Sequence, residues 1–297
     1  MKKLTFASIA TSLAAAVILA ACAVETPPEP SIDAPPTARV AEGLGTLTFD
    51  TTAIATNPVP SLPARPLTQG AFGLPNVQRS LIGSSATFNR TIAAGNRTYY
   101  DSGTWHAEID PIGGQILAVS QAPGQRPVVQ NEATLEASSR ARLASFGIPA
   151  DELGAVAQRR SMNLDEQDGT TAAAAELDGY KTFAIRGING IRIQGHRAVL
   201  TYGPDGVFRR ALMKWPALAA TGHKIRTALS TADITVRATR ALTAEGITAG
   251  AIKLRWFYAP TELPSGEVTL ELRVMALVPV STDLGEGRAV EVIVDAS

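Results

Sequence analysis

Apolar and polar residues alternate between positions 98 and 121, which is the pattern of a strand with one buried face. Over 105–110 the odd positions are apolar and the even positions are polar. Turn residues follow from Pro111 to Gly114, and a second apolar stretch returns at 116–119. This part of the chain therefore predicts a β-hairpin.

Two longer stretches have helical spacing. Residues 131–147 begin at Asn131, a good N-cap, and stop at Gly147. Residues 230–246 begin with Ser230 and Asp233 in the arrangement of a capping box, and stop at Gly246. Both stretches carry an apolar stripe, so each predicts a helix that packs on a sheet.

The remaining periodic segments predict strands. A second hairpin is expected over 191–212 around the turn GPDG at 203–206, with further strands at 155–164, 251–260, 266–280 and 288–297. The acidic, alanine-rich stretch between 165 and 179 predicts a loop. The fold class expected is α+β, with antiparallel sheets of hairpins packed on two helices. The segments HAEIDPIGGQIL and HRAVLTYGPDGVF each precede a helix, which favours a duplicated unit.

Proline marks the region before these elements. Ten of the 19 prolines lie between Pro27 and Pro75, so residues 22–75 predict an extended tether, with GTLTF at 45–49 as a short strand within it. The body is then expected to contain a first α+β unit at 76–215 and a second at 216–297.

The first 21 residues have the pattern of an export signal, with a basic start and an apolar run at 4–21. The run ends in Leu19-Ala20-Ala21-Cys22, which resembles the lipobox of bacterial lipoproteins. The resemblance implies cleavage before Cys22, acylation (palmitate among the chains) of that residue, and a mature chain without a free thiol. Ala23 is typical of lipoproteins sent to the outer membrane, facing the periplasm or the cell surface. The alternative is a stray cysteine at the end of an anchor helix.

Charge is balanced overall but segregated along the chain. The 27 basic and 27 acidic residues cancel, which argues against nucleic acid as the partner. Residues 179–256 contain 13 basic and three acidic side chains, whereas 132–178 contain four and nine, and 257–297 contain two and seven. These regions either pair internally, at about 0.2–1 kcal/mol for each cross-strand pair, or leave a positive face for an anionic partner. The equal and opposite flanks favour internal pairing.

The basic region contains five candidate partner-binding residues: Arg192, His196, Arg197, Arg209 and Arg210. In a regular strand, Arg192 and His196 share a face unless a bulge intervenes, and Arg209 and Arg210 point to opposite faces. A polar sheet face paired with acidic neighbours explains the same residues, so both interpretations stay open.

The stretch GINGIRIQGHRAVLTYGPDGVFRRA, following a helix and a strand, resembles the PepSY and protease-propeptide type of domain, a cystatin-like arrangement. The likeness is best at about 180–215 and fainter over 230–295, and Arg192 stands where such domains usually have a small residue or proline. Members are secreted or membrane-attached modules without chemistry of their own, so the resemblance implies binding or restraint of an envelope protein, and two duplicated units.

Motifs for catalysis are scarce. The chain has no H-E-x-x-H helix, no G-x-S-x-G elbow and no phosphate-binding loop. His106, Glu108 and Asp110 point to one side of a strand, but successive members lie about 6.5–7 Å apart along it, too far for the outer pair to share one metal ion easily. No catalytic residue, metal site or cofactor is therefore expected.

The predicted function is a lipid-anchored, non-catalytic binding or regulatory module of the bacterial envelope, acting on a protein or an anionic glycolipid. An envelope hydrolase with an unrecognised site and a structural subunit of an envelope assembly are the alternatives.

Overall fold

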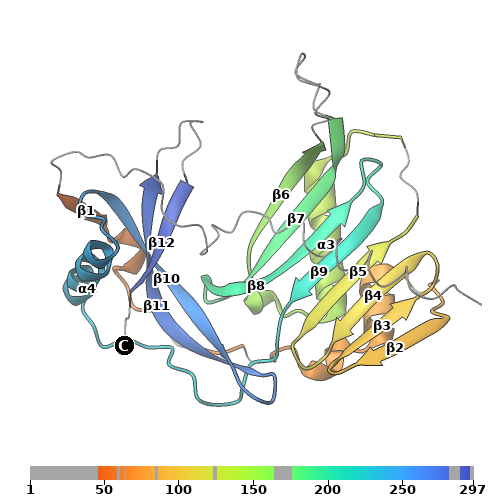
Figure 1. The fold of residues 1–297 in the computed structure, drawn as a ribbon, viewed down its shortest axis with the longest axis horizontal. Helices are drawn as coiled ribbons and strands as arrows, with labels where there is room; N and C mark the ends of the chain where they lie inside the picture. Colours follow the sequence, from red (N-terminus) through yellow and green to blue (C-terminus); the bar gives the residue numbers. More distant parts are fainter. Residues whose placement is uncertain are drawn as a thin grey trace, which may run out of the picture.

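The computed structural model describes residues 46–58, 61–63, 65–83, 86–122, 126–163, 176–280 and 288–294 (Figure 1). The strands are β1 (Leu47–Asp50), β2 (Arg90–Ala94), β3 (Arg97–Asp101), β4 (Trp105–Asp110), β5 (Gln115–Ser120), β6 (Leu153–Asn163), β7 (Glu176–Ile188), β8 (Ile191–Tyr202), β9 (Phe208–Lys214), β10 (Gly250–Glu262), β11 (Val268–Val280) and β12 (Arg288–Val294). The helical segments are η1 (Thr52–Ile54), η2 (Gln69–Phe72), α2 (Leu74–Val77), η3 (Gln78–Ile82), α3 (Glu132–Phe146), η4 (Ala150–Glu152) and α4 (Thr231–Ala244). The predicted α+β class is confirmed.

The two main helices begin and end where the sequence predicts. The side chain of Asn131 accepts a hydrogen bond from the backbone N–H of Ala133 at 3.0 Å, and Gly147 ends α3 in the left-handed conformation. Ser230 and Asp233 form the predicted capping box at the start of α4. These caps satisfy backbone N–H groups that the helix itself leaves without partners.

Each helix packs on its own antiparallel sheet, as Figure 1 shows. In the first unit α3 lies against strands in the order β2-β3-β4-β5-β9-β8-β7-β6, and Leu135, Leu143 and Phe146 bury its apolar stripe. In the second unit α4 covers β10, β11 and β12 through Ile234 and Leu242. Because each sheet has one face on a helix, each unit has its own apolar core.

Strand β8 belongs to both units. Its residues 197–202 pair with β7 and β9, whereas Ile193 is bridged in parallel to Tyr258 of β10. Gly195 lies between the two parts with φ +72°, a conformation that glycine adopts without strain. Ile188 and Ile193 consequently enter the apolar core of the second unit. The pairing joins all twelve strands into one continuous sheet.

A second contact fixes the units from the other side. The β10–β11 turn touches the β4–β5 turn so closely that a Cβ on Gly266 would lie 2.2 Å from a side-chain carbon of Ile112. Nearby, the side-chain amide of Gln69 donates to the carbonyl of Ser265 at 2.8 Å. Each unit therefore contacts the other through a hairpin. The β7–β8 hairpin contributes to the second core, and the β10–β11 turn packs against the β4–β5 turn.

The predicted tether at 22–75 is too long. Strand β1 pairs in parallel with β10, Leu47 opposite Gly250, and Leu67 and Phe72 are buried in the first core. The cause is long-range pairing, which the local proline bias of this segment does not reveal. The unit boundary after residue 215 divides most of the two cores, but β1, Ile54 and the β7–β8 turn pack with the second unit. The predicted loop at 165–179 is too long, because β7 begins at Glu176. The signal at 1–21, Cys22 and residues 165–175 lie outside the described residues.

Candidate binding face

The bulge at Gly195 separates the predicted partner-binding residues of β8. Beyond this glycine the alternation resumes one residue out of phase, so His196 turns inward and is 2% exposed. The expectation that His196 shares a polar face with Arg192 and contacts a partner is incompatible with this burial. Arg192 and Arg197 are both partly exposed, and Nη2 of Arg192 lies 2.9 Å from the sulfur of Met275.

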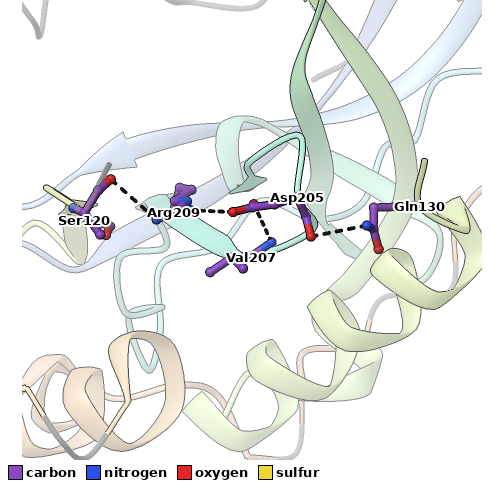
Figure 2. Close-up of polar contacts among 6 residues, drawn as sticks. Ser120, Gln130, Asp205, Val207 and Arg209 are labelled. Carbon is purple, nitrogen blue, oxygen red and sulfur yellow. Dashed lines mark hydrogen bonds and ion pairs between the residues drawn. The ribbon is translucent and has the colours of Figure 1, made fainter. Parts of the chain in front are cut away.

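Arg209 fixes the β8–β9 turn (Figure 2). Its Nη2 lies 2.6 Å from Oδ2 of Asp205, whose Oδ1 accepts the backbone N–H of Val207 at 2.9 Å. The carbonyl of Asp205 accepts a hydrogen bond from Nε2 of Gln130 at 3.2 Å. Burial acts to raise the pKa of Asp205, but the bonds from Val207 and Arg209 outweigh it and lower that pKa. Arg209 therefore stabilises the β8–β9 turn, whereas Arg210 lies within the sheet, in register with Val119 of β5.

One arginine of the basic region is wholly internal. Arg186 is 0% exposed, and its Nη2 lies 2.7 Å from Oε2 of Glu152, itself fully buried. The indole N–H of Trp215 donates to the same carboxylate oxygen at 2.8 Å, and Nη1 of Arg186 donates to the carbonyl of Pro216 at 2.6 Å. The guanidinium also lies 5.3 Å from the centre of the Trp215 ring. This cluster ties η4 and β7 to the segment that leads into the second unit.

His196 lies near this cluster in a neutral state. Burial, reinforced by the positive charges of Arg186 and Lys214, lowers the pKa of His196 to about 3. Neither of its ring nitrogens has a hydrogen-bond partner among the described residues. Protonation of His196 is therefore unfavourable in the folded chain.

The sheet face opposite α3 carries aligned rows of side chains, because the strand register places equivalent residues side by side. The central row contains Tyr99, Leu117, Leu212, Val199 and Phe183, and it is interrupted on β4 by Glu108. The row nearer the β8–β9 turn contains Val119, Arg210, Thr201, Lys181 and Arg159. The row nearer the β7–β8 hairpin contains Asp110, Gln115, Lys214 and Arg197. We call this surface the open face.

The open face presents apolar residues between basic ones. Within the described residues, both apolar cores are built without the central row, so these side chains serve neither helix. Leu117, Leu212 and Phe183 are partly exposed, while Arg159 is exposed. Strand alternation indicates such a face, because alternate residues of each strand point away from the core. Only the register of the sheet shows which of these residues lie side by side.

A hollow of about 290 Å³ opens at the hairpin side of the open face. Its walls carry both signs of charge, with Arg97 and Asp110 toward β3 and β4, and Arg197 and Lys214 toward β8 and β9. Leu117 is among its apolar lining residues. The hollow is thus a charged recess in a surface that is otherwise amphipathic.

Internal ion pairs account for part of the charge segregation. Lys214 pairs with Glu262 at 3.1 Å, and Lys224 approaches Glu271 at 3.8 Å, which joins the basic region to its acidic C-terminal flank. The Arg186–Glu152 pair joins it to the preceding acidic region. The interpretation of charge pairing within the sheet holds for these residues.

Two members of the His106, Glu108 and Asp110 set have separate structural roles: Glu108 forms a surface ion pair, and Asp110 stabilises a turn. Glu108 pairs with Arg97 at 2.8 Å, and Oδ1 of Asp110 accepts the backbone N–H of Gly113 at 2.8 Å. In the described part of the chain no group of three or more His, Cys, Asp or Glu side chains is placed to hold a metal ion. Likewise, no helix of the described ranges has the length and apolar character needed to cross a bilayer.

No family model matches the chain, and no curated protein matches it. A solved structure of an uncharacterized protein from Eubacterium rectale ATCC 33656 is similar at a TM-score of 0.45 and 10% identity, over 74% of this chain and 76% of that one.

Proposed function

We propose that this chain is a lipid-anchored protein of the bacterial outer membrane whose body is a non-catalytic binding module. Its partner is a protein with an acidic surface, held on the open face. One observation carries the proposal: an apolar row crosses the four adjacent strands β5, β9, β8 and β7, between flanks that contain Arg159, Lys181 and Arg210 on one side and Arg197 and Lys214 on the other.

The composition of the open face favours a protein as the partner. Protein interfaces have an apolar centre and a polar rim, and they are enriched in aromatic residues and arginine. Tyr99 and Phe183 lie in the central row, and the flanks are mainly arginine and lysine. The strand spacing and the three rows give an area on the order of 300 Å², which suits a small and transient interface.

The membrane attachment rests on Leu19-Ala20-Ala21-Cys22, which resembles a lipobox. Cys22 receives the acyl chains in this proposal. Metabolic labelling with a palmitate analogue tests it, since the label should enter the wild-type chain and be lost in Cys22→Ser. Labelling that persists in this variant would remove the anchor from the proposal.

The two units are, in this proposal, duplicated PepSY-like modules. In support, α3 is followed by the antiparallel strands β6 to β9, and α4 by β10 to β12. Such modules bind or restrain other envelope proteins without performing chemistry, which agrees with a binding role.

A synthetic peptide tests the open face directly. A fluorescent peptide of alternating Glu and Leu residues presents apolar and acidic groups together, and its binding is followed by anisotropy at low and high salt. We expect measurable binding that weakens with salt, because exposed charge pairs are screened. Reversing two flank charges, Arg159→Glu with Lys181→Glu, should weaken binding at least about tenfold.

A matched charge reversal on the second unit provides the control. Lys253 and Arg255 are exposed on β10, away from the open face. Lys253→Glu with Arg255→Glu changes the net charge equally and should leave the affinity unchanged. If both double variants lose the same affinity, the attraction is a general charge effect and the open face is not the binding surface.

A further inference from the structure

Three large apolar side chains stand exposed at one end of the first unit. Val128 is 56% exposed, Val129 83% and Val207 46%. They belong to residues 126–130, just before α3, and to the β8–β9 turn at 203–207. The two segments are joined directly, because the backbone N–H of Val128 donates to the carbonyl of Pro204 at 2.9 Å. We call these two segments together the valine tip.

Hydrogen bonds and close packing hold in place the backbone that carries the exposed valines. Figure 2 shows Asp205 at the centre of the valine tip, in contact with Gln130 on one side and with Val207 and Arg209 on the other. A Cβ on Gly206 would lie 2.5 Å from the side chain of Gln130, so the turn and the preceding segment pack closely. The network of polar contacts holds the backbone in place while the apolar side chains point out of it.

Within the two segments of the valine tip, the exposed charge is a cation. Arg126 is exposed two residues before Val128. The only carboxylate of the two segments is Asp205, whose side chain is 5% exposed and paired with Arg209. The exposed surface of the valine tip therefore consists of apolar side chains and the Arg126 cation, because the side chain of Asp205 is buried and paired with Arg209.

We propose that the valine tip inserts into the interfacial layer of a phospholipid bilayer. An apolar projection enters the boundary between headgroups and acyl chains, and a neighbouring cation favours the phosphate layer. The open face lies along the strands, whereas the valine tip lies at their end, so the inference is independent of the proposed protein partner. Insertion would set the strands of the first unit at a steep angle to the membrane and leave the open face accessible.

The test uses the full chain reconstituted into vesicles of phosphatidylethanolamine and phosphatidylglycerol. An environment-sensitive fluorescent amino acid replaces Val129 in one preparation and Val236 in the other. Val236 is a matched control because it is a valine of α4 that is 57% exposed, far along the chain from the valine tip. Brominated lipids quench fluorophores within the bilayer, and aqueous iodide quenches those in water.

Brominated lipid should quench the fluorophore at 129 at least about threefold more than that at 236, with the reverse order for iodide. Val128→Ser with Val207→Ser, both exposed positions, should return the fluorophore at 129 to the behaviour of the control. Equal quenching at 129 and 236 would overturn the proposal. Protection of 129 from iodide without quenching by brominated lipid would overturn it too, because a second copy or another protein would then cover the valine tip.

Discussion

Acidification should destabilise this protein in part through His196. Its ring is 2% exposed and has no hydrogen-bond partner among the described residues, and burial lowers its pKa to about 3. In the unfolded chain a histidine titrates near 6.5. Because the folded pKa is the lower one, the unfolded state binds the extra proton first as the pH falls. Stability is therefore complete above about pH 6.5 and is lost as the pH falls toward about 3.

The shift in pKa sets the size of the effect. The whole difference, about 3.5 pKa units at 1.36 kcal/mol each, corresponds to about 5 kcal/mol below both pKa values. At pH 5 the same two values give a loss of about 2 kcal/mol in the free energy of unfolding relative to pH 8. That loss is a large fraction of the stability of an ordinary domain.

Replacing His196 with leucine, a side chain of similar volume, removes the titration. Urea unfolding followed by tryptophan fluorescence gives the free energy of unfolding at pH 8 and pH 5. His196→Leu should be at least as stable as the wild type at pH 8, because no buried ring nitrogen then lacks a partner, and its loss at pH 5 should be smaller by about 2 kcal/mol. His106→Gln, on the open face, keeps His196 and should keep the wild-type loss. An equal loss in His196→Leu and the wild type would refute the assignment.

Three further changes have defined outcomes in the same unfolding assay. Glu152→Leu leaves Arg186 as an unpaired buried cation and should cost about 3–5 kcal/mol, whereas adding Arg186→Leu should restore most of that loss. Ser230→Ala removes the capping box of α4 and should cost about 1 kcal/mol. Gly114→Ala should cost at least about 2 kcal/mol more than Gly95→Ala. Both glycines have φ near +60°, but a Cβ would lie 2.4 Å from interunit backbone only at Gly114.

Local signals in the sequence predicted the helices and hairpins of this fold. Asn131 and Gly147 bound α3, and Ser230 with Asp233 starts α4, because caps and stripes are properties of neighbouring residues. The segment at 69–82 was assigned in part to a tether, yet it is helical and buries Phe72. The local proline bias did not reveal this burial, because burial depends on partners far along the sequence.

The candidate site was predicted less well, for a related reason. Strand periodicity placed His196 with Arg192 on a polar face, and one glycine in the left-handed conformation at 195 reversed that placement. Sequence composition counted Arg186 only as one of the basic residues of 179–256, and it did not show that this residue pairs in the interior with Glu152, 34 positions away. The pattern of charge along a chain identifies which regions attract one another, but the register of the sheet decides which residues remain outside.

The shared strand constrains how this protein can act. A module with two freely hinged units would adapt its shape to a partner, but β8 runs through both sheets and the β10–β11 turn closes against Ile112 from the other side. Relative rotation of the units would have to break strand pairing and expose Ile188 and Ile193 from the second core. The two units should therefore keep a fixed orientation relative to each other. A hinge between the units would then not supply the freedom to search for a partner.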